Sequence, residues 1–316
     1  MFKFAFVVLN YNSLDETYKC LESILRIKYD NIEIVLIDNA SKEQEEFVER
    51  FSDIKDTRVH VLLSKKNVGY ARGNNIGIHY AINNLNCDFV CVINPDVVVE
   101  DVNFVDTILK EFKKEKFAVS GPKIINHLGD NINPLLGYQE GIGYWIYSFL
   151  GCLRIYIVKL FNLRRFNIFS KNRTSRDCIN NIEYKENTPI DKETHVINEI
   201  NGEMLSGACL IFSPIYFEKY TGFCNKTFLY NEEYILKYAS ARLGLKMIYI
   251  NQTEILHKGG KSSPYSDDDI RGKIMFMHKE GAKSALHIIG IMIHKPSVKY
   301  LNKLLSPKCD KYIIIL

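Results

Sequence analysis

The feature that most constrains the fold is an alternation of apolar runs and amphipathic stretches over the first third of the chain. Apolar runs of strand length occupy residues 3–9, 32–37, 58–63 and 89–93. The stretches between them, residues 14–27, 42–52 and 72–84, have helical character. Strands that alternate with helices pair in parallel through right-handed crossovers, and the helices cover both faces of the sheet. We therefore expect an α/β fold with a mostly parallel central sheet.

Polar residues follow each of the four apolar runs. They are Asn10-Tyr11-Asn12, Asp38-Asn39-Ala40-Ser41, the stretch 67–75 (NVGYARGNN) and Asn94-Pro95-Asp96. Ligands of open α/β sheets bind beyond the carboxyl ends of the strands. Each segment alone is typical of turns, because Asn, Asp and Gly are turn formers. Together on one edge of one sheet, the four segments favour a nucleotide pocket.

The loops that usually hold phosphates are missing from this sequence. Residues 9–15 (LNYNSLD) contain no glycine where a dinucleotide fold needs GxGxxG, although Asp38 matches the acid after its second strand. No GxxxxGK[ST] loop occurs either. A divalent metal is the other usual way to neutralise a diphosphate, and Mg²⁺ or Mn²⁺ binds hard oxygen ligands. Asp96 is the candidate ligand, on a turn stiffened by Pro95.

Composition excludes some classes of partner and location. The net charge of +4 is too small to indicate nucleic acid as the main partner. Eight cysteines occur without a CxxC pair, which favours buried free thiols in a reducing cytosol over disulfides or a zinc site. The apolar stretch at the start of the chain is too short for a signal peptide and lacks a cleavage site. We therefore expect a cytoplasmic protein.

Taken in order, the motifs resemble those of family 2 glycosyltransferases with the GT-A fold, especially the rhamnosyltransferase-like branch. The matching stretches are VVLNYNS (7–13), VLIDNAS (35–41), NVGYARGNNIGI (67–78), INPDV (93–97), GPKI (121–124), MLSGACLIF (204–212), GFCNKTFLYNEE (222–233) and ILHKGGKSS (255–263). The resemblance covers about residues 3 to 263 and implies a Rossmann-like, nucleotide-binding sandwich.

The resemblance also implies roles for individual residues. The residues expected to bind the nucleotide are Asn10, Tyr11, Asp38, Asn67, Arg72, Asn75 and Asn94. Asp96 stands where the family has the metal ligand of a DxD-type motif, and His257 stands where it has a histidine near the metal or diphosphate. The implied cofactor is Mn²⁺ or Mg²⁺. Asn94 replaces the first acid of the motif, which leaves fewer anionic ligands.

Glu232 and Glu233 fall where the family usually has a Glu-Asp pair. The second acid of that pair is the general base of an inverting displacement, so the resemblance assigns this role to Glu233. Glu232 would then be a supporting residue, or the base itself if the register differs. A second interpretation remains open from the sequence, because acids at the start of a helix also complement its dipole.

Three hypotheses of function follow. The first is an inverting, metal-dependent transfer from a dTDP- or UDP-sugar donor to a glycan or lipid-linked acceptor, in the synthesis of a bacterial-type surface polysaccharide. The second is a sugar-phosphate nucleotidyltransferase, which should have a more basic phosphate loop than residues 67–75. The third is a catalytically degenerate scaffold, which the departures Asn94, Cys224 and Glu233 keep open.

We expect one catalytic domain over residues 1–265 and a C-terminal helical extension over 266–316. The domain would consist of a nucleotide-sugar half (1–125), a helical insertion (137–200) and an acceptor half (201–265). Residues 142–173 are rich in apolar and basic side chains, and Arg154 and Lys159 interrupt the apolar run. They are expected either to bind peripherally at the inner face of the cell membrane or to pack on this protein or on a second copy in a homo-oligomer.

Overall fold

The computed structural model describes residues 1–135, 141–161, 193–197, 203–259, 270–293, 297–307 and 313–315. Its strands are β1 (Phe4–Asn10), β2 (Ile32–Asp38), β3 (Val59–Ser64), β4 (Phe89–Ile93), β5 (Val97–Val98), β6 (Val119–Asn126), β7 (His195–Val196), β8 (Cys209–Phe212), β9 (Met247–His257) and β10 (Ile313–Ile315). Its helices are α1 (Leu14–Leu25), α2 (Gln44–Ser52), α3 (Tyr70–Asn83), α4 (Phe104–Glu115), α5 (Ile142–Leu160), α7 (Pro214–Phe217), α8 (Glu232–Leu243), α9 (Ile270–Ile293) and α10 (Val298–Leu304).

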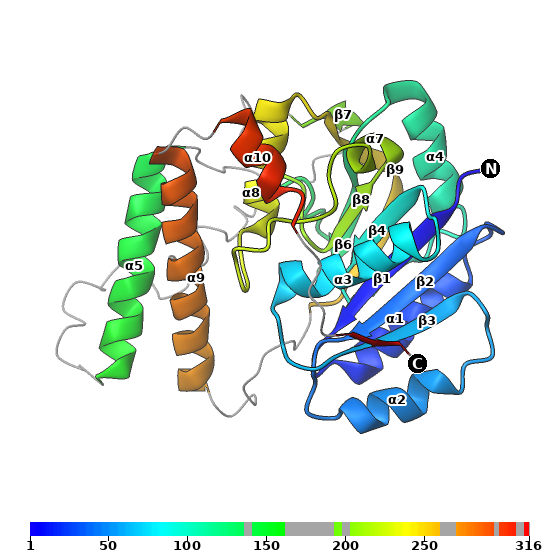
Figure 1. The fold of residues 1–316 in the computed structure, drawn as a ribbon, viewed down its shortest axis with the longest axis horizontal. Helices are drawn as coiled ribbons and strands as arrows, with labels where there is room; N and C mark the ends of the chain where they lie inside the picture. The colour runs from blue at the N-terminus through cyan, green and yellow to red at the C-terminus, as the bar shows by residue number, and fades with distance from the viewer. Residues whose placement is uncertain are drawn as a thin grey trace.

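All described strands form one sheet, in the order β10-β3-β2-β1-β4-β8-β6-β9-β5, with β7 also paired to β9 (Figure 1). The strands β3, β2, β1 and β4 run parallel, as the alternation of strands and helices predicted. Asn10 lies opposite Asp38 in the β1–β2 register, so two of the polar strand ends meet. The α/β fold class is therefore confirmed.

The second half of the sheet is mixed. Strand β8 lies antiparallel between β4 and β6, whereas β6 and β9 run parallel to each other. The short strand β5 pairs antiparallel with the end of β9, so that Val97 lies opposite His257. This pairing brings the Asn94-Pro95-Asp96 turn next to the end of a strand that lies far away in the sequence.

Two apolar cores cover the two faces of the sheet. Side chains alternate along β1: Phe6 and Val8 pack with α1, α2 and α4, whereas Ala5 and Val7 pack with α3 and α8. Helix α3 lies close to β1, because a Cβ at Gly77 would come within 2.5 Å of the Val7 side chain. The six cysteines among the described residues are buried free thiols, in agreement with the sequence.

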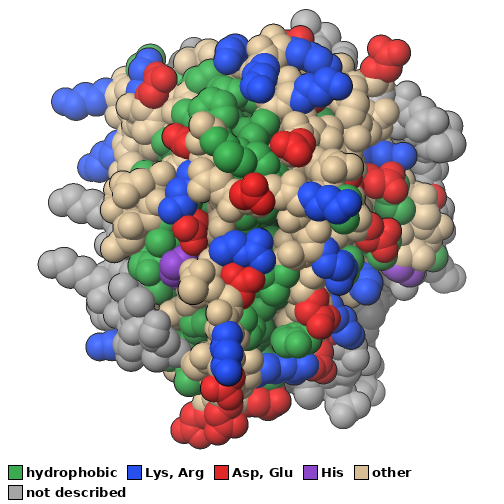
Figure 2. All heavy atoms as spheres, turned by 90° about the vertical axis from the view of Figure 1, so that its right-hand side faces the viewer, with side chains coloured by type: hydrophobic (Ala, Val, Ile, Leu, Met, Phe, Trp, Pro, Cys, Tyr) green, Lys and Arg blue, Asp and Glu red, His purple; other side chains and the backbone are tan. Residues whose placement is uncertain are grey.

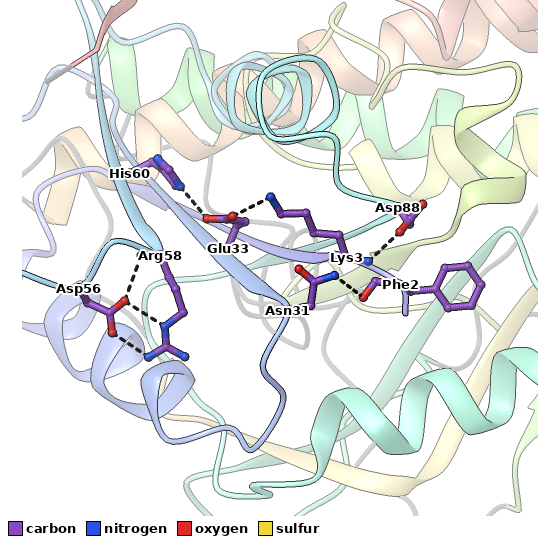
Figure 3. A network of polar contacts seen from close by, with 8 residues as sticks. All are labelled: Phe2, Lys3, Asn31, Glu33, Asp56, Arg58, His60 and Asp88. Carbon is purple, nitrogen blue, oxygen red and sulfur yellow. Dashed lines mark hydrogen bonds and ion pairs between the residues drawn. The ribbon is translucent and has the colours of Figure 1, made fainter.

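A polar network ties together the amino-terminal edge of the parallel strands, the edge opposite the predicted pocket (Figure 3). Glu33 lies between Lys3 and His60, with contacts of 2.8 Å to Lys3 Nζ and 2.7 Å to His60 Nε2. Partial burial raises the pKa of Glu33, but the hydrogen bonds from Lys3 and His60 outweigh burial and lower it. Asp88 accepts a hydrogen bond from the Lys3 backbone N–H. We interpret this network as structural.

The C-terminal part of the chain adds the helices α9 and α10 and the strand β10, which pairs antiparallel with β3. Helices α5 and α9 lie side by side, with α5 outermost (Figure 1). We refer to this pair, residues 142–160 and 270–293, as the helical hairpin for brevity, although the two helices are not consecutive in the sequence. Across the described residues, no helix combines the length and apolar character needed to cross a membrane. Of the insertion predicted at 137–200, residues 141–161 and 193–197 are described, and the rest lies outside the described residues.

Candidate active site

A cavity of about 450 Å³ opens beyond the carboxyl ends of β1, β2 and β4. Its walls are formed by Leu9, Tyr11, Asn39, Asn67, Gly69, Tyr70, Asn94, Pro95, Asp96, Phe228, Leu229 and Phe276. A larger hollow of about 630 Å³ lies beside Phe2, Tyr29 and Asp88, at the opposite end of the strands. The predicted site residues gather at the first cavity, and open α/β sheets bind ligands at that edge. We therefore take the first cavity as the candidate active site.

Four residues predicted to bind the nucleotide or metal line this cavity directly: Tyr11, Asn67, Asn94 and Asp96. They come from three different strand ends. The Asn94 backbone N–H donates a hydrogen bond to the carbonyl of Ala208, which ties the turn after β4 to the strand β8. The sequence therefore predicted correctly that these distant segments converge.

Asn10 and Asp38 lie behind the cavity wall. Asp38 is fully buried, and both of its oxygens accept hydrogen bonds: Oδ1 from Asn10 Nδ2 at 2.7 Å, and Oδ2 from Gln44 Nε2 at 2.7 Å and from the Ser41 backbone N–H at 3.0 Å. Asn10 Oδ1 in turn accepts from Thr17 Oγ1. In this structure the two side chains hold the ends of β1 and β2 together.

Asn39, which the sequence analysis did not select, lines the cavity instead of its neighbour Asp38. Its side chain donates to Asn67 Oδ1 at 3.1 Å and accepts from the Val68 backbone N–H at 3.0 Å. The signal was present, because Asn39 belongs to the same polar segment as Asp38. The sequence alone did not show which of the two neighbours reaches the cavity wall.

Arg72 and Asn75, on α3, are absent from the lining of the cavity. Asn75 is buried, donates to the Phe223 carbonyl at 2.9 Å and accepts from the Phe223 backbone N–H at 2.8 Å. Arg72 Nε donates to the carbonyl of Asn225 at 2.9 Å. Both side chains thus fix the segment that leads to Phe228 and Leu229 in the cavity wall.

Gly69 begins α3 at the rim of the cavity. Its φ of +86° and ψ of 178° belong to a region that is essentially restricted to glycine. A Cβ at this position would lie 2.3 Å from the carbonyl oxygen of Phe228. The Tyr70 backbone N–H donates to the same oxygen at 2.8 Å. Glycine therefore allows the two sides of the cavity to meet, backbone against backbone.

Asp96 and His257 form a pair at the edge of the cavity. Asp96 Oδ2 lies 3.0 Å from His257 Nε2, because the β5–β9 pairing brings the two segments together. No cluster of three or more potential ligands among His, Cys, Asp and Glu occurs in the described part of the chain. A carboxylate and an imidazole fit Mn²⁺, or Mg²⁺ less well, provided that substrate oxygens or waters complete the coordination.

Glu232 and Glu233 begin α8 behind Tyr70. A Cβ placed on Gly207 would lie 3.7 Å from Glu233 Oε2 and 3.8 Å from the Tyr70 hydroxyl, so no side chain at position 207 separates this acid from the cavity wall. The Tyr70 hydroxyl donates to the Gly207 carbonyl at 2.7 Å. Glu233 is partly exposed, whereas Glu232 is 4% exposed. The geometry therefore favours Glu233 as the acid that meets a substrate.

Burial changes the pKa values of these groups. It raises the pKa of Glu232 to about 8, with a further contribution from the charge of Glu233. Burial also raises the pKa of Glu233. The pKa of Tyr70 lies well above its usual value, because burial and then the charges of Glu233 and Glu232 disfavour the phenolate. Raised carboxyl pKa values beside a cavity are typical of general acids and bases.

One aromatic wall of the cavity was not predicted. Phe276, on α9, packs edge to face against Phe228 with ring centroids 6.2 Å apart. Phe276 belongs to the C-terminal extension, which the sequence analysis separated from the catalytic domain. No signal in the sequence links it to the cavity, because the contact depends on how the hairpin packs.

The fold and the site define the class of protein. Solved structures of the GT-A glycosyltransferases TarS (residues 1–349, S. aureus) and GalNAc-T7 superimpose on 96% of this chain. Their TM-scores are 0.54 and 0.57, their sequence identities to this chain are 12% and 11%, and the match covers 69% and 54% of their own chains. At such low identity the likeness shows the fold alone. The fold is thus of the GT-A type.

The sequence comparisons then give the family. The model of glycosyl transferase family 2 matches residues 5–177, more than half of the chain. The protein belongs to this family.

Two curated relatives match smaller parts of the chain. The low-salt glycan biosynthesis hexosyltransferase Agl10 of Haloferax volcanii is 29% identical over 129 residues, which is 40% of this chain and 38% of Agl10. The glycosyltransferase GlyG of Streptococcus pneumoniae serotype 4 is 30% identical over 110 residues, which is 34% of this chain and 35% of GlyG. The matched part thus spans little more than a third of these relatives.

Proposed function

We propose that this glycosyltransferase transfers a sugar from a UDP- or dTDP-sugar, with metal dependence and inversion of the anomeric configuration, to a glycan or lipid-linked acceptor. The observation that carries the proposal is that a candidate metal-binding pair and a candidate general base lie close to the same cavity. The Asp96–His257 pair lies at its edge, and Glu233 lies near the hydroxyl of the wall residue Tyr70, with no side chain at position 207 between them. A metal-held diphosphate and a general base are the two requirements of an inverting displacement.

The choice of donor is supported by the similar structures. TarS was solved with UDP-GlcNAc and with UDP, and GalNAc-T7 with UDP, GalNAc and Mn²⁺. These ligands favour a uridine donor and Mn²⁺ for this chain as well. A dTDP-sugar with rhamnose as the transferred group, which the resemblance to the rhamnosyltransferase-like branch implies, is the second donor to test.

In the proposed mechanism the acceptor hydroxyl attacks the anomeric carbon while the bond to the diphosphate breaks. Glu233 accepts the proton of the hydroxyl and must therefore be ionised. A divalent cation, when bound, would supply positive charge against the departing diphosphate, and Asp96 and His257 are the residues that would hold it. Tyr11, Asn39 and Asn67 would contact the nucleoside, with Asn10 and Asp38 supporting them from behind.

Residues 1–265 would form the catalytic domain, and residues 266–316 would complete its cavity through Phe276. We place the reaction in the cytoplasm, at the inner face of the cell membrane, in the synthesis of a surface polysaccharide. The free thiols support a reducing compartment. The nucleotidyltransferase and scaffold hypotheses gain no specific support from the geometry, whereas Asp96 in the cavity lining and Glu233 near the wall residue Tyr70 support the transferase proposal.

The experiment that tests the proposed function identifies the reaction product and its anomeric configuration. The protein is incubated with Mn²⁺, each of several UDP- and dTDP-sugars, and alkyl glycosides as acceptors. NMR then gives the anomeric configuration of the new linkage. We expect release of nucleoside diphosphate and an inverted product with one donor. A retained configuration would contradict the mechanism, and release of pyrophosphate from a nucleoside triphosphate would favour the nucleotidyltransferase hypothesis instead.

A further inference from the structure

One face of α5 is apolar and exposed along the whole helix. Its residues lie three, four or seven positions from another member of the set, so they share one stripe. They are Ile146, Tyr147, Leu150, Ile157 and, directly after the helix, Phe161. The exposed fractions of Tyr147, Leu150 and Phe161 are 52%, 56% and 65%. Arg154 is the one charged residue within the stripe. Contiguous exposed apolar surface of this kind indicates an interaction site.

The rest of α5 is already used for packing within the protein. Its Trp145 ring lies 4.6 Å from the ring of Tyr234 on α8. Cys152 faces α9, because a Cβ placed on Gly281 of that helix would lie 3.4 Å from the Cys152 sulfur. The Arg271 guanidinium donates to the Lys159 carbonyl at 2.6 Å. The hairpin is therefore anchored, and α5 lies at the edge of the molecule (Figure 1), with its apolar stripe exposed.

The charge of the hairpin is strongly one-sided. Its described residues, 141–161 and 270–293, contain six bases: Arg154, Lys159, Arg271, Lys273, Lys279 and Lys283. They contain one acid, Glu280, which is buried and paired with Lys283 at 2.7 Å. The face of the molecule opposite the hairpin, in contrast, carries acidic and basic side chains interspersed around a hydrophobic strip (Figure 2).

We propose that the helical hairpin binds the surface of an anionic lipid bilayer, with the apolar stripe of α5 in the headgroup region. An apolar face flanked by bases is the pattern that places a helix in the plane of a membrane surface. A second copy of the chain is the alternative occupant. A symmetric pairing through α5 would bring two basic hairpins together, and like charges oppose such contact.

The hairpin also connects this surface to the active site. Phe276 of α9 lines the cavity, and Ser284 of the same helix donates from Oγ to the carbonyl of Leu229, another lining residue, at 3.0 Å. A hairpin seated on the bilayer therefore holds this wall of the cavity near the lipid. The acceptor would then be one with a lipid anchor, a step that rests on the proposed function.

Sedimentation with lipid vesicles tests the proposal. The full chain is mixed with vesicles of neutral phosphatidylcholine, or of phosphatidylcholine with an added anionic lipid. We expect binding to the anionic vesicles and weakening by salt, because the attraction is electrostatic in part. Leu150→Glu should weaken binding at least tenfold, and Tyr147→Glu should act in the same way. Leu128→Glu is the matched control, since Leu128 is 70% exposed in a turn outside the hairpin.

The outcomes separate this proposal from the proposed function. Absence of binding by the wild type, or equal binding by Leu150→Glu and Leu128→Glu, would overturn the membrane proposal. So would a wild-type dimer in vesicle-free sedimentation velocity that Leu150→Glu converts to a monomer. Calorimetric binding of UDP is measured on each variant in parallel. Intact UDP binding with failed vesicle binding refutes this inference alone, whereas failed UDP binding by the wild type bears on the proposed function.

Discussion

The carboxyl of Glu233 is the side chain on which the proposed chemistry depends most. Glu233→Gln keeps the shape of the residue but removes the proton acceptor, so we expect the rate of transfer to fall by roughly 10²- to 10⁴-fold. Nucleotide binding should change little, because the acid is placed at the acceptor end. Burial raises the pKa of Glu233, so wild-type activity should fall as the pH drops below that raised value. Turnover by Glu232→Gln is the control, and an equal loss in both variants would contradict the assignment.

Glu232 makes a separate prediction about stability. Its pKa is about 8 in the folded protein and about 4.5 when unfolded. The stabilisation from burying its neutral form is thus complete below pH 4.5 and is lost as the pH rises through about 8. Glu232→Gln stays neutral, so its stability relative to wild type should rise between pH 5 and pH 8.5, by a few kcal/mol at about 1.4 kcal/mol per pKa unit. Thermal melts of both proteins at the two pH values measure this, and a constant difference would refute it.

At the scale of single residues, the sequence predicts which segments reach the site better than it predicts which side chain of a segment does. Tyr11, Asn67, Asn94 and Asp96 line the cavity as predicted. Asn10 and Asp38 come from the right segments, but their polar atoms are hydrogen-bonded to each other and to Thr17 and Gln44 behind the cavity wall. Which polar side chain of a strand end faces a ligand depends on hydrogen bonds between distant segments. A single sequence does not display those bonds.

At the scale of elements, the start of α3 is the most constrained point. Gly69→Ala would place a Cβ 2.3 Å from the Phe228 carbonyl oxygen at a φ of +86°. We expect a loss of roughly 2–4 kcal/mol in the free energy of unfolding, from backbone strain plus the clash, and weaker nucleotide binding. Gly129→Ala is the matched control, with a φ of +90° but nothing within 4 Å. Equal losses in urea melts of the two variants would show that the contact with Phe228 does not matter.

The contribution of α9 to the cavity is also testable. Phe276→Ala removes the ring that packs against Phe228, and we expect nucleotide affinity to fall roughly fivefold to tenfold, since such a ring pair is worth about 1 kcal/mol. Leu286→Ala, an exposed change on the same helix, should leave the affinity unchanged. If Phe276→Ala binds nucleotide as wild type does, the cavity does not extend to α9.

The elements that the sequence predicted well are those with local patterns. The strands β1 to β4 and the helices between them follow from periodicity and from the rule that such units pair in parallel. The antiparallel insertion of β8 between β4 and β6 could not be predicted, because it pairs residues more than ninety positions apart. The packing of α5 on α9 could not be predicted for the same reason.

For the molecule as a whole, the central claim is that one cavity combines a metal site and a sugar-nucleotide site. Its edge pair, Asp96 and His257, comes from β-segments that only the folded sheet brings together. The extension after residue 265 supplies a cavity wall, so the site depends on the complete described fold and not on the first half alone.

Calorimetric titration with UDP, dTDP and GDP, each with and without Mn²⁺, tests this claim most directly. It is carried out on the wild type, on Asp96→Ala and on Asp53→Ala, an exposed acid at the end of α2 that serves as the control. The account predicts that one nucleotide, most plainly UDP, binds only with Mn²⁺, and that Asp96→Ala alone abolishes this binding. Nucleotide binding that is independent of the metal and unaffected by Asp96→Ala would contradict the account.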